Sequence, residues 1–132
     1  MRFSVSTGAR EQMVDVTRRV AEAVVESGVQ SGVAVVFSMH TTAAVTINEN
    51  ADPDVVTDMV EGLDRIAPRD AGWRHREGNS DGHVKTSLVG PSVTVPVEGG
   101  RLVLGTWQGI YLCEFDGPRT RTLDVTVLPG VR

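Results

Sequence analysis

The spacing of hydrophobic residues changes several times along this chain, and the order of those changes limits the fold more than any other feature. Strand-like segments cover residues 3–16, 33–37, 43–47, 93–97, 102–116 and 120–128. The three- and four-residue spacing of an amphipathic helix appears twice, from Thr17 to Gly28 and from Asp52-Pro53 to about Ile66. This order predicts an α+β protein in which helices cover one mostly antiparallel sheet, or two packed sheets.

Composition fits one globular domain spanning residues 1–132. The chain is 40% hydrophobic and 23% charged, which excludes a disordered or collagen-like chain. Its formal net charge of −4 is opposite to the basic balance of nonspecific nucleic-acid binders, so we expect no nucleic-acid partner. The single cysteine, Cys113, lies in an apolar strand and is predicted to be a buried hydrophobic side chain.

No segment of the sequence has the pattern of a secretion signal or a membrane span. The N-terminus lacks the apolar core of a secretory signal peptide. The longest apolar stretch, residues 32–39, is far shorter than the roughly 20 residues that span a bilayer. We therefore expect a cytoplasmic protein with no membrane contact.

The most polar part of the chain is a 16-residue segment, 67–82, which has no apolar period and is predicted to be a loop. It contains Glu77, Asn79 and Asp81, and His83 follows directly. Such residues with interspersed glycines let the backbone approach a ligand or ion closely, although any solvated turn has a similar composition. Long loops inside small domains are often functional, and the density of polar groups favours that interpretation here.

Three histidines, His40, His75 and His83, are the only ones in the chain, and all fall at strand ends or beside the long loop. Three imidazoles with one open position form a catalytic site for zinc or a similar ion. The alternative is that each ring is separately hydrogen-bonded or exposed. The hydroxyls of Thr41 and Thr42 follow His40 at a strand end, where they are placed either to contact an anion or to form a polar turn.

A second group of charged residues lies near the end of the chain. Glu114 falls on one strand face with Asp116, and Arg119 and Arg121 follow shortly after. Acidic groups beside two arginines predict either a salt-bridged network or an anion site held by the guanidinium groups.

Taken together, four ordered motifs resemble the small YjbQ-like proteins, a family often labelled secondary thiamine-phosphate synthase. The resemblance covers nearly the whole chain. The motifs are His40-Thr41-Thr42-Ala43 with Asn48-Glu49, Glu77-Gly78-Asn79 with Asp81 and His83, Gly105-Thr106-Trp107-Gln108, and Glu114 with Asp116-Gly117-Pro118-Arg119 and Arg121.

This resemblance implies an α+β fold of two packed antiparallel sheets with flanking helices, assembled as a homotrimer with its site near the subunit contacts. It makes the three histidines the leading ligands for a divalent metal ion of the zinc or magnesium class. Other residues receive roles as general bases or as contacts to a small phosphorylated or anionic ligand: Glu77, Asp81 and Glu114 for the first role, and Thr41, Thr42, Asn79, Arg119 and Arg121 for the second.

Three hypotheses follow from the sequence. The first is a metal-assisted enzyme acting on a small phosphorylated or anionic substrate, either a thiamine-phosphate synthase-like transferase or a metal-dependent hydrolase. The second is a noncatalytic trimeric protein that binds a metal or an anion. In the third, the charged residues only stabilise a subunit interface.

Overall fold

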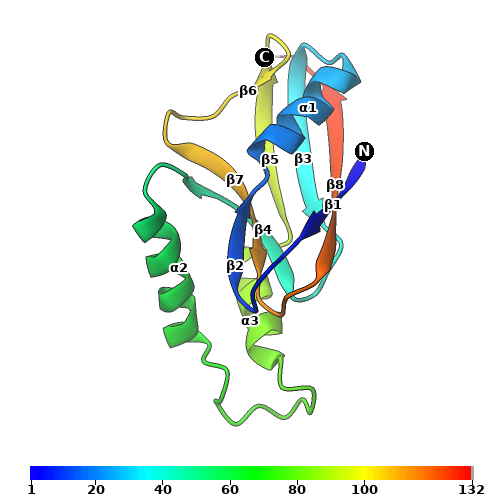
Figure 1. Cartoon of the computed structure of the whole chain (residues 1–132). Helices are drawn as coiled ribbons and strands as arrows, with labels where there is room; N and C mark the ends of the chain where they lie inside the picture. Colours follow the sequence, from blue (N-terminus) through cyan, green and yellow to red (C-terminus); the bar gives the residue numbers. More distant parts are fainter. Residues whose placement is uncertain (132) are drawn as a thin grey trace.

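The chain forms two antiparallel sheets and three helices within residues 1–131, which the computed structural model describes (Figure 1). The larger sheet has the strand order β1-β8-β3-β5-β6, with bounds Arg2–Ser6, Thr120–Pro129, Ser31–Ser38, Ser92–Glu98 and Arg101–Leu102. The smaller sheet has the order β2-β7-β4, with bounds Gln12–Asp15, Gln108–Glu114 and Ala43–Glu49. The predicted α+β fold of two packed antiparallel sheets is confirmed.

The two sheets bury one hydrophobic core between them, because alternate residues of each strand point to the same face. Val36 and Val125 enter this core from the larger sheet, and Val45 and Leu112 enter it from the smaller one. The intervening residues of the smaller sheet, including Cys113, point the other way and form a second cluster under the helices. The smaller sheet is therefore apolar on both faces, one packed against the larger sheet and the other against the helices.

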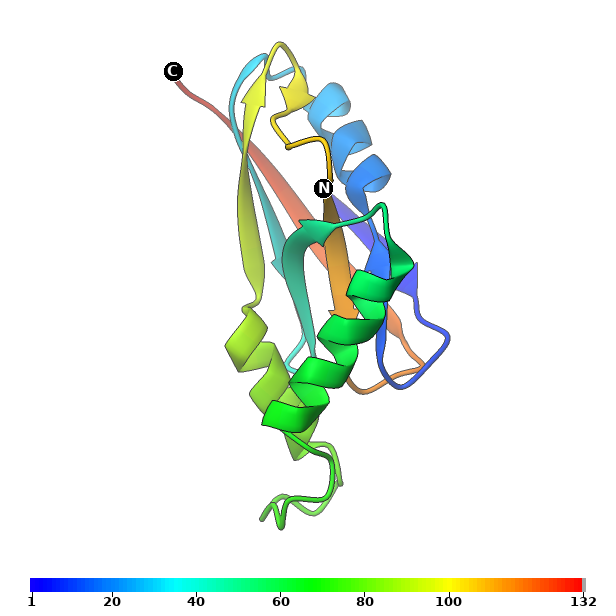
Figure 2. The ribbon, with the colours of Figure 1, turned by 90° about the vertical axis from the view of Figure 1, so that its left-hand side faces the viewer.

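Two helices follow the predicted apolar stripes. Helix α1, Thr17–Ser27, ends at Gly28, whose φ of 72° is the left-handed conformation that glycine adopts without strain. Helix α2, Pro53–Ile66, begins after Asp52, whose side chain accepts a hydrogen bond from the Asp54 amide at 2.9 Å. Figure 2 shows α2 lying in front of the smaller sheet, where Val56 and Leu63 of the helix pack on the second cluster.

A third helix, α3, spans Ser80–Val89 and was not predicted. The predicted loop therefore ends at residue 79, and Asp81 and His83 lie on a helix instead. The spacing of apolar residues does not predict this helix, because its buried side is not apolar. Its buried residues are Asp81, Gly82, Lys85 and Thr86. Gly82 packs so closely that a Cβ there would lie 3.0 Å from the Phe115 carbonyl oxygen.

The segment between α2 and α3 projects beyond the lower end of both helices (Figures 1 and 2). At the same end, the β3–β4 loop and the β7–β8 turn approach the start of α3. The predicted turn at Gly117-Pro118 is present, with a cis peptide bond. This end of the molecule thus collects the polar motifs that the sequence separates.

The outer face of the larger sheet is covered by no helix (Figure 1). It carries half-buried Val33 and Val35 together with exposed Phe37, Pro96 and Leu128. None of the helices within residues 1–131 is long and apolar enough to cross a membrane.

Candidate functional site

A cavity of about 340 Å³ opens at the end of the molecule where the polar motifs meet. We call it the polar cavity. Its walls come from the β3–β4 loop, the residues that lead into α3, the first turn of α3 and the β7–β8 turn. It is lined by Met39, His40, Thr41, Thr42, Glu77, Asn79, His83, Asp116, Arg119 and Arg121. The structure therefore brings together all the predicted site residues except His75, Asp81 and Glu114.

Below the polar cavity, Arg121 and Glu114 form a buried ion pair. Arg121 Nε donates to both carboxylate oxygens of Glu114, at 2.9 and 3.0 Å, and Arg121 Nη2 forms a further short bond to the same group. Thr7 Oγ1 donates to Glu114 at 2.7 Å, and Arg121 Nη2 donates to Thr42 Oγ1 at 2.9 Å. We call these four residues the strand network, because they join β7, β8 and the residue after β1 to the β3–β4 loop.

The contacts of Glu114 in the strand network argue against a role as a general base. The side chain is fully buried, and every contact that it makes stabilises its ionised form. Burial alone would raise the pKa of Glu114, but the hydrogen bonds from Arg121 and Thr7 outweigh it and lower the pKa. Of the two alternatives for this region, a salt-bridged network describes Glu114 and Arg121.

Arg119 is the more available cation of the polar cavity. Its side chain is 55% exposed and donates to Asp116 Oδ2 at 2.9 Å. The same Asp116 oxygen accepts a hydrogen bond from Asn79 Nδ2 at 2.9 Å. Asn79 Oδ1, in contrast, is buried with no partner among the described residues. Buried amide oxygens normally have a donor, so this acceptor is an exception among the buried polar atoms of the described residues.

His40, which lines the polar cavity, has one ring nitrogen already engaged in a hydrogen bond. Its Nε2 accepts a hydrogen bond from the Thr122 amide at 2.8 Å, so the proton of the neutral ring lies on Nδ1. Burial lowers the pKa of His40, and the nearby positive charges of Arg121 and Arg119 lower it further, against the opposite effect of Glu114. These shifts favour a neutral ring in a locally positive environment.

His83 lies between the polar cavity and a second cavity of about 650 Å³, which is lined by the projecting segment and α3. His75 lines only the second cavity, and its ring meets that of His83 edge to face with centroids 5.6 Å apart. His75 Nε2 also lies 3.6 Å from Glu77 Oε2. The three histidines are therefore neighbours in space but do not converge on one point.

The geometry of one chain does not fit a three-histidine metal site. The Nε2 lone pair of His40 is already used, and His75 lies outside the polar cavity. Across residues 1–131, the metal-capable side chains that gather within ligating reach of one another are Glu11, Asp64 and Asp81, and these surround a lysine. The histidine ligand set remains a prediction from the sequence.

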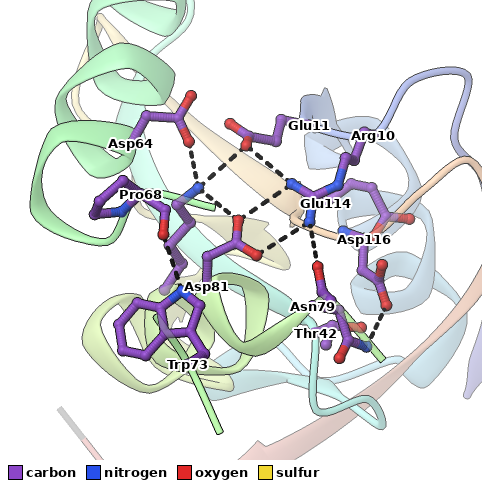
Figure 3. A network of polar contacts seen from close by, with 12 residues as sticks. Arg10, Glu11, Thr42, Asp64, Pro68, Trp73, Asn79, Asp81, Glu114 and Asp116 are labelled. Atoms are coloured by element: carbon purple, nitrogen blue, oxygen red, sulfur yellow. Dashed lines mark hydrogen bonds and ion pairs between the residues drawn. The ribbon is translucent and has the colours of Figure 1, made fainter. Parts of the chain in front are cut away.

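The cluster around that lysine lies on the opposite side of α3 from the polar cavity. Lys85 Nζ, fully buried, contacts Glu11 at 3.1 Å, Asp81 at 3.2 Å and Asp64 at a short distance. Arg10 completes the cluster with two bonds to Asp81, at 3.0 and 3.1 Å. Figure 3 shows the three carboxylates directed toward one another, with Arg10 beyond Asp81. We call these five residues the lysine cluster.

The contacts of the lysine cluster argue against a role of Asp81 as a general base. The sequence pattern did not predict this cluster. Burial alone would raise the pKa of Asp81, but hydrogen bonds from Arg10 and Lys85 outweigh it and lower the pKa. One signal was present: Lys85 is the only lysine of the chain and lies four residues after Asp81. Nothing in the sequence indicates that residues 10, 11 and 64 join this pair.

Comparison with known proteins gives a consistent result. Residues 1–130 match the model of the family described as UPF0047 protein YjbQ-like. The chain belongs to this family. It is 52% identical over 127 residues to the UPF0047 protein YugU of Bacillus subtilis, with 96% of each chain covered. It is 46% identical to a UPF0047 protein of Methanocaldococcus jannaschii, covering 96% of this chain and 92% of that one.

Solved structures of UPF0047 relatives share the whole fold. A protein of Clostridium acetobutylicum, described as an uncharacterized conserved member of the family, has a TM-score of 0.95 at 51% identity and covers 97% of this chain and 99% of its own. A protein of unknown function from Sulfolobus solfataricus has a TM-score of 0.95 at 32% identity, covering 98% and 96%. The predicted family is therefore confirmed, and it is a family of uncharacterised proteins.

Proposed function

We propose that this UPF0047 protein is an enzyme that acts on a small molecule bearing a phosphate or similar anionic group, which binds in the polar cavity. The observation that carries the proposal is the convergence of Arg119, the His40 N–H and the start of α3 on one small space. No side chain caps the start of α3, and the partial positive charge of this helix end favours an anion nearby. A volume of about 340 Å³ suits a small ligand.

Each residue receives a role from its contacts. Arg119 and the neutral His40 bind the anion, and Thr41 and Thr42 lie in the same wall. His83 is the residue proposed to transfer a proton, because no side-chain hydrogen bond engages its ring within the described part of the chain. Glu77 lies in the same cavity as a carboxylate that is accessible to solvent. Imidazole and carboxylate groups are the usual partners in general acid–base catalysis.

Thiamine-phosphate synthesis is a reaction of this substrate class. It joins a pyrimidine diphosphate to a thiazole phosphate and releases pyrophosphate, so both reactants and the leaving group are anions. The family resemblance makes this pair the first to test. Cation donors at the cavity would stabilise the charge on the leaving group.

We also propose that the protein works as a homotrimer. The uncovered outer face of the larger sheet supports this, since it combines Phe37 and Leu128 with half-buried valines. Exposed apolar surface of this kind marks contact sites between chains. Sedimentation equilibrium is expected to give three times the chain mass, and Phe37→Glu is expected to shift the protein toward the monomer. A monomeric wild-type protein would overturn this assembly.

The test of the proposed function is binding and turnover of phosphorylated compounds. Isothermal titration with inorganic phosphate and pyrophosphate is expected to show binding that weakens about tenfold or more in Arg119→Gln, the scale of one lost charged hydrogen bond. Arg18→Gln, which changes an exposed arginine that pairs with Glu22, is the control and should bind like wild type. Unchanged binding in Arg119→Gln would overturn the assignment of the anion to this cavity.

Turnover separates an enzyme from a binding protein. Pyrophosphate release from the thiamine-phosphate precursors and phosphate release from a panel of small esters are expected in wild type and lost in His83→Asn. Tight phosphate binding with no turnover across the panel would instead favour the noncatalytic binding protein.

Metal dependence is tested separately, since no role above requires a metal. Phosphate binding is expected to persist after dialysis against a chelator, because its donors are side-chain N–H groups. Loss of binding on chelation, restored by zinc or magnesium and abolished in His75→Asn and His83→Asn, would support the histidine ligand set instead.

A further inference from the structure

Helix α3 presents two different polar faces, and the four-residue repeat of the helix explains how. Asn79, at the start of the helix, and His83 are four residues apart and line the polar cavity. Asp81 and Lys85 are also four residues apart and belong to the lysine cluster. One short segment therefore carries both groups, and the position of the second pair fixes the position of the first.

The lysine cluster holds α3 from three directions. Lys85 Nζ is bonded to Asp81 of its own helix, to Asp64 of α2 and to Glu11 just before β2. Arg10 donates two hydrogen bonds to Asp81. Its Nη2 lies 3.4 Å from the carbonyl oxygen of Gly78, the residue before Asn79. These contacts bracket the first turn of α3 (Figure 3). Asn79 and His83, at the two ends of this turn, line the polar cavity.

Stability alone gives little reason for this arrangement. Removing an ammonium and a carboxylate from water costs several kcal/mol per ion, and well-packed apolar side chains often replace such groups with no loss of stability. What the charged groups add is direction, because each hydrogen bond fixes an angle as well as a distance. Hydrogen bonds that fix both an angle and a distance are useful where neighbouring side chains must be placed accurately.

We propose that Lys85 is a positioning residue of the polar cavity: through Asp81 it fixes the first turn of α3 and so places Asn79 and His83. This rests on the proposed function for its effect on ligand binding. Its effect on the His83 ring does not depend on any ligand. Lys85 itself, being fully buried, does not contact the substrate.

The test uses three variants of the full-length protein. Lys85→Met removes the ammonium, and Asp81→Asn removes the carboxylate that transmits its position. Asp64→Asn is the matched control, because it removes a partner of Lys85 on α2 that forms no hydrogen bond with the first turn of α3. Two measurements are made below the unfolding range of every variant: inorganic phosphate affinity, and the ring signals and pH titrations of the three histidines by NMR.

We expect Lys85→Met and Asp81→Asn to weaken phosphate binding about tenfold and to displace the His83 ring signals and titration, with the His40 signals unchanged. Asp64→Asn should lower the thermal midpoint but leave phosphate affinity and the His83 titration within twofold of wild type. His83 signals and phosphate affinity that stay at wild-type values in folded Lys85→Met would overturn the proposal. So would losses that simply follow the order of thermal stability across the three variants.

The two proposals fail in different ways. If wild type binds no phosphate, the proposed function fails, and the His83 signals of the unliganded variants still decide the role of Lys85. If Lys85→Met does not fold, Lys85→Gln, which removes the charge of the lysine but keeps an N–H donor and leaves the Arg10–Asp81 bonds in place, decides it by the same two measurements.

Discussion

The strand network and the lysine cluster are both buried groups of charges, but they are built differently. The strand network pairs one guanidinium with one carboxylate, and hydroxyl groups complete it, all held by strands and the loops between them. The lysine cluster has three carboxylates facing two cations, and it depends on a turn and two helices. One joins the two sheets, and the other joins the helices to the sheets.

The difference appears in the ionisation of the carboxylates. In the strand network the pKa of Glu114 is lowered, so the group is ionised throughout the physiological range. In the lysine cluster the pKa of Glu11 is raised by burial and by its hydrogen bond with Asp64, although Lys85 opposes this. The other two carboxylates of the lysine cluster differ from Glu11, because hydrogen bonds outweigh burial and lower the pKa values of Asp64 and Asp81.

The largest effect is expected from breaking the strand network. Arg121→Met leaves the Glu114 carboxylate buried without its cation, and removing one partner of a buried pair costs about 3–5 kcal/mol. Urea unfolding at neutral pH measures this loss of the free energy of unfolding. The double variant Arg121→Met with Glu114→Gln should recover part of the loss, because no buried charge remains. A loss below about 1 kcal/mol in the single variant, the range of exposed pairs, would contradict the buried assignment.

A smaller, local effect is expected from loosening the lysine cluster. Cys113 lies under α2, and burial raises the pKa of its thiol to about 12, so a thiol reagent reaches it only when the structure opens. Asp64→Asn cuts the ion pair between α2 and Lys85, and labelling of Cys113 should accelerate about tenfold, as a change of 1.4 kcal/mol in local opening would give. Arg18→Gln should label at the wild-type rate. Equal rates in all three proteins would show that Asp64 does not hold α2.

The smallest effect is a difference in pH dependence. The pKa of Glu11 is raised in the folded state, so its contribution to stability is complete below its ordinary pKa and is lost as the pH rises through the folded pKa. Glu114 has the opposite sign: its lowered pKa contributes stability above the ordinary pKa, which is lost as the pH falls through the folded pKa. Urea unfolding of Glu11→Gln between pH 4 and 8 should not show the decrease in the free energy of unfolding that wild type shows as the pH rises. The decrease as the pH falls should remain. A wild-type decline that persists in Glu11→Gln would assign it to another group.

The sequence was sufficient to predict features that depend on residues close together in the chain. The apolar patterns predicted an α+β protein with one covered sheet or two packed sheets, the family resemblance favoured two, and Asp52-Pro53 predicted the start of α2. Cys113 was predicted to be a buried hydrophobic side chain, and it is buried. Each of these depends on neighbours within a few residues.

Helix α3 and the lysine cluster could not be predicted in the same way. A helix is recognised by its apolar face, and the buried face of α3 is polar because it meets charged partners instead of the core. Those partners are distant in sequence: Glu11 is 74 residues from Lys85, and Asp64 is 21 residues away. Carboxylates in a motif look alike until the structure shows which of them meets a cation, so Glu114 and Asp81 were grouped with Glu77.

The strand order of the larger sheet has a consequence for how the protein is made. Strand β8 lies between β1 and β3, but it is synthesised after both of them. While the chain grows from the ribosome, β1 and β3 have emerged, and the strand that joins them has not. Until β8 arrives, each has an unpaired edge, and the core lacks Leu123 and Val125. The nascent protein therefore cannot complete its larger sheet early, and the interval before β8 emerges is when it is most open to wrong pairing and to chaperone binding.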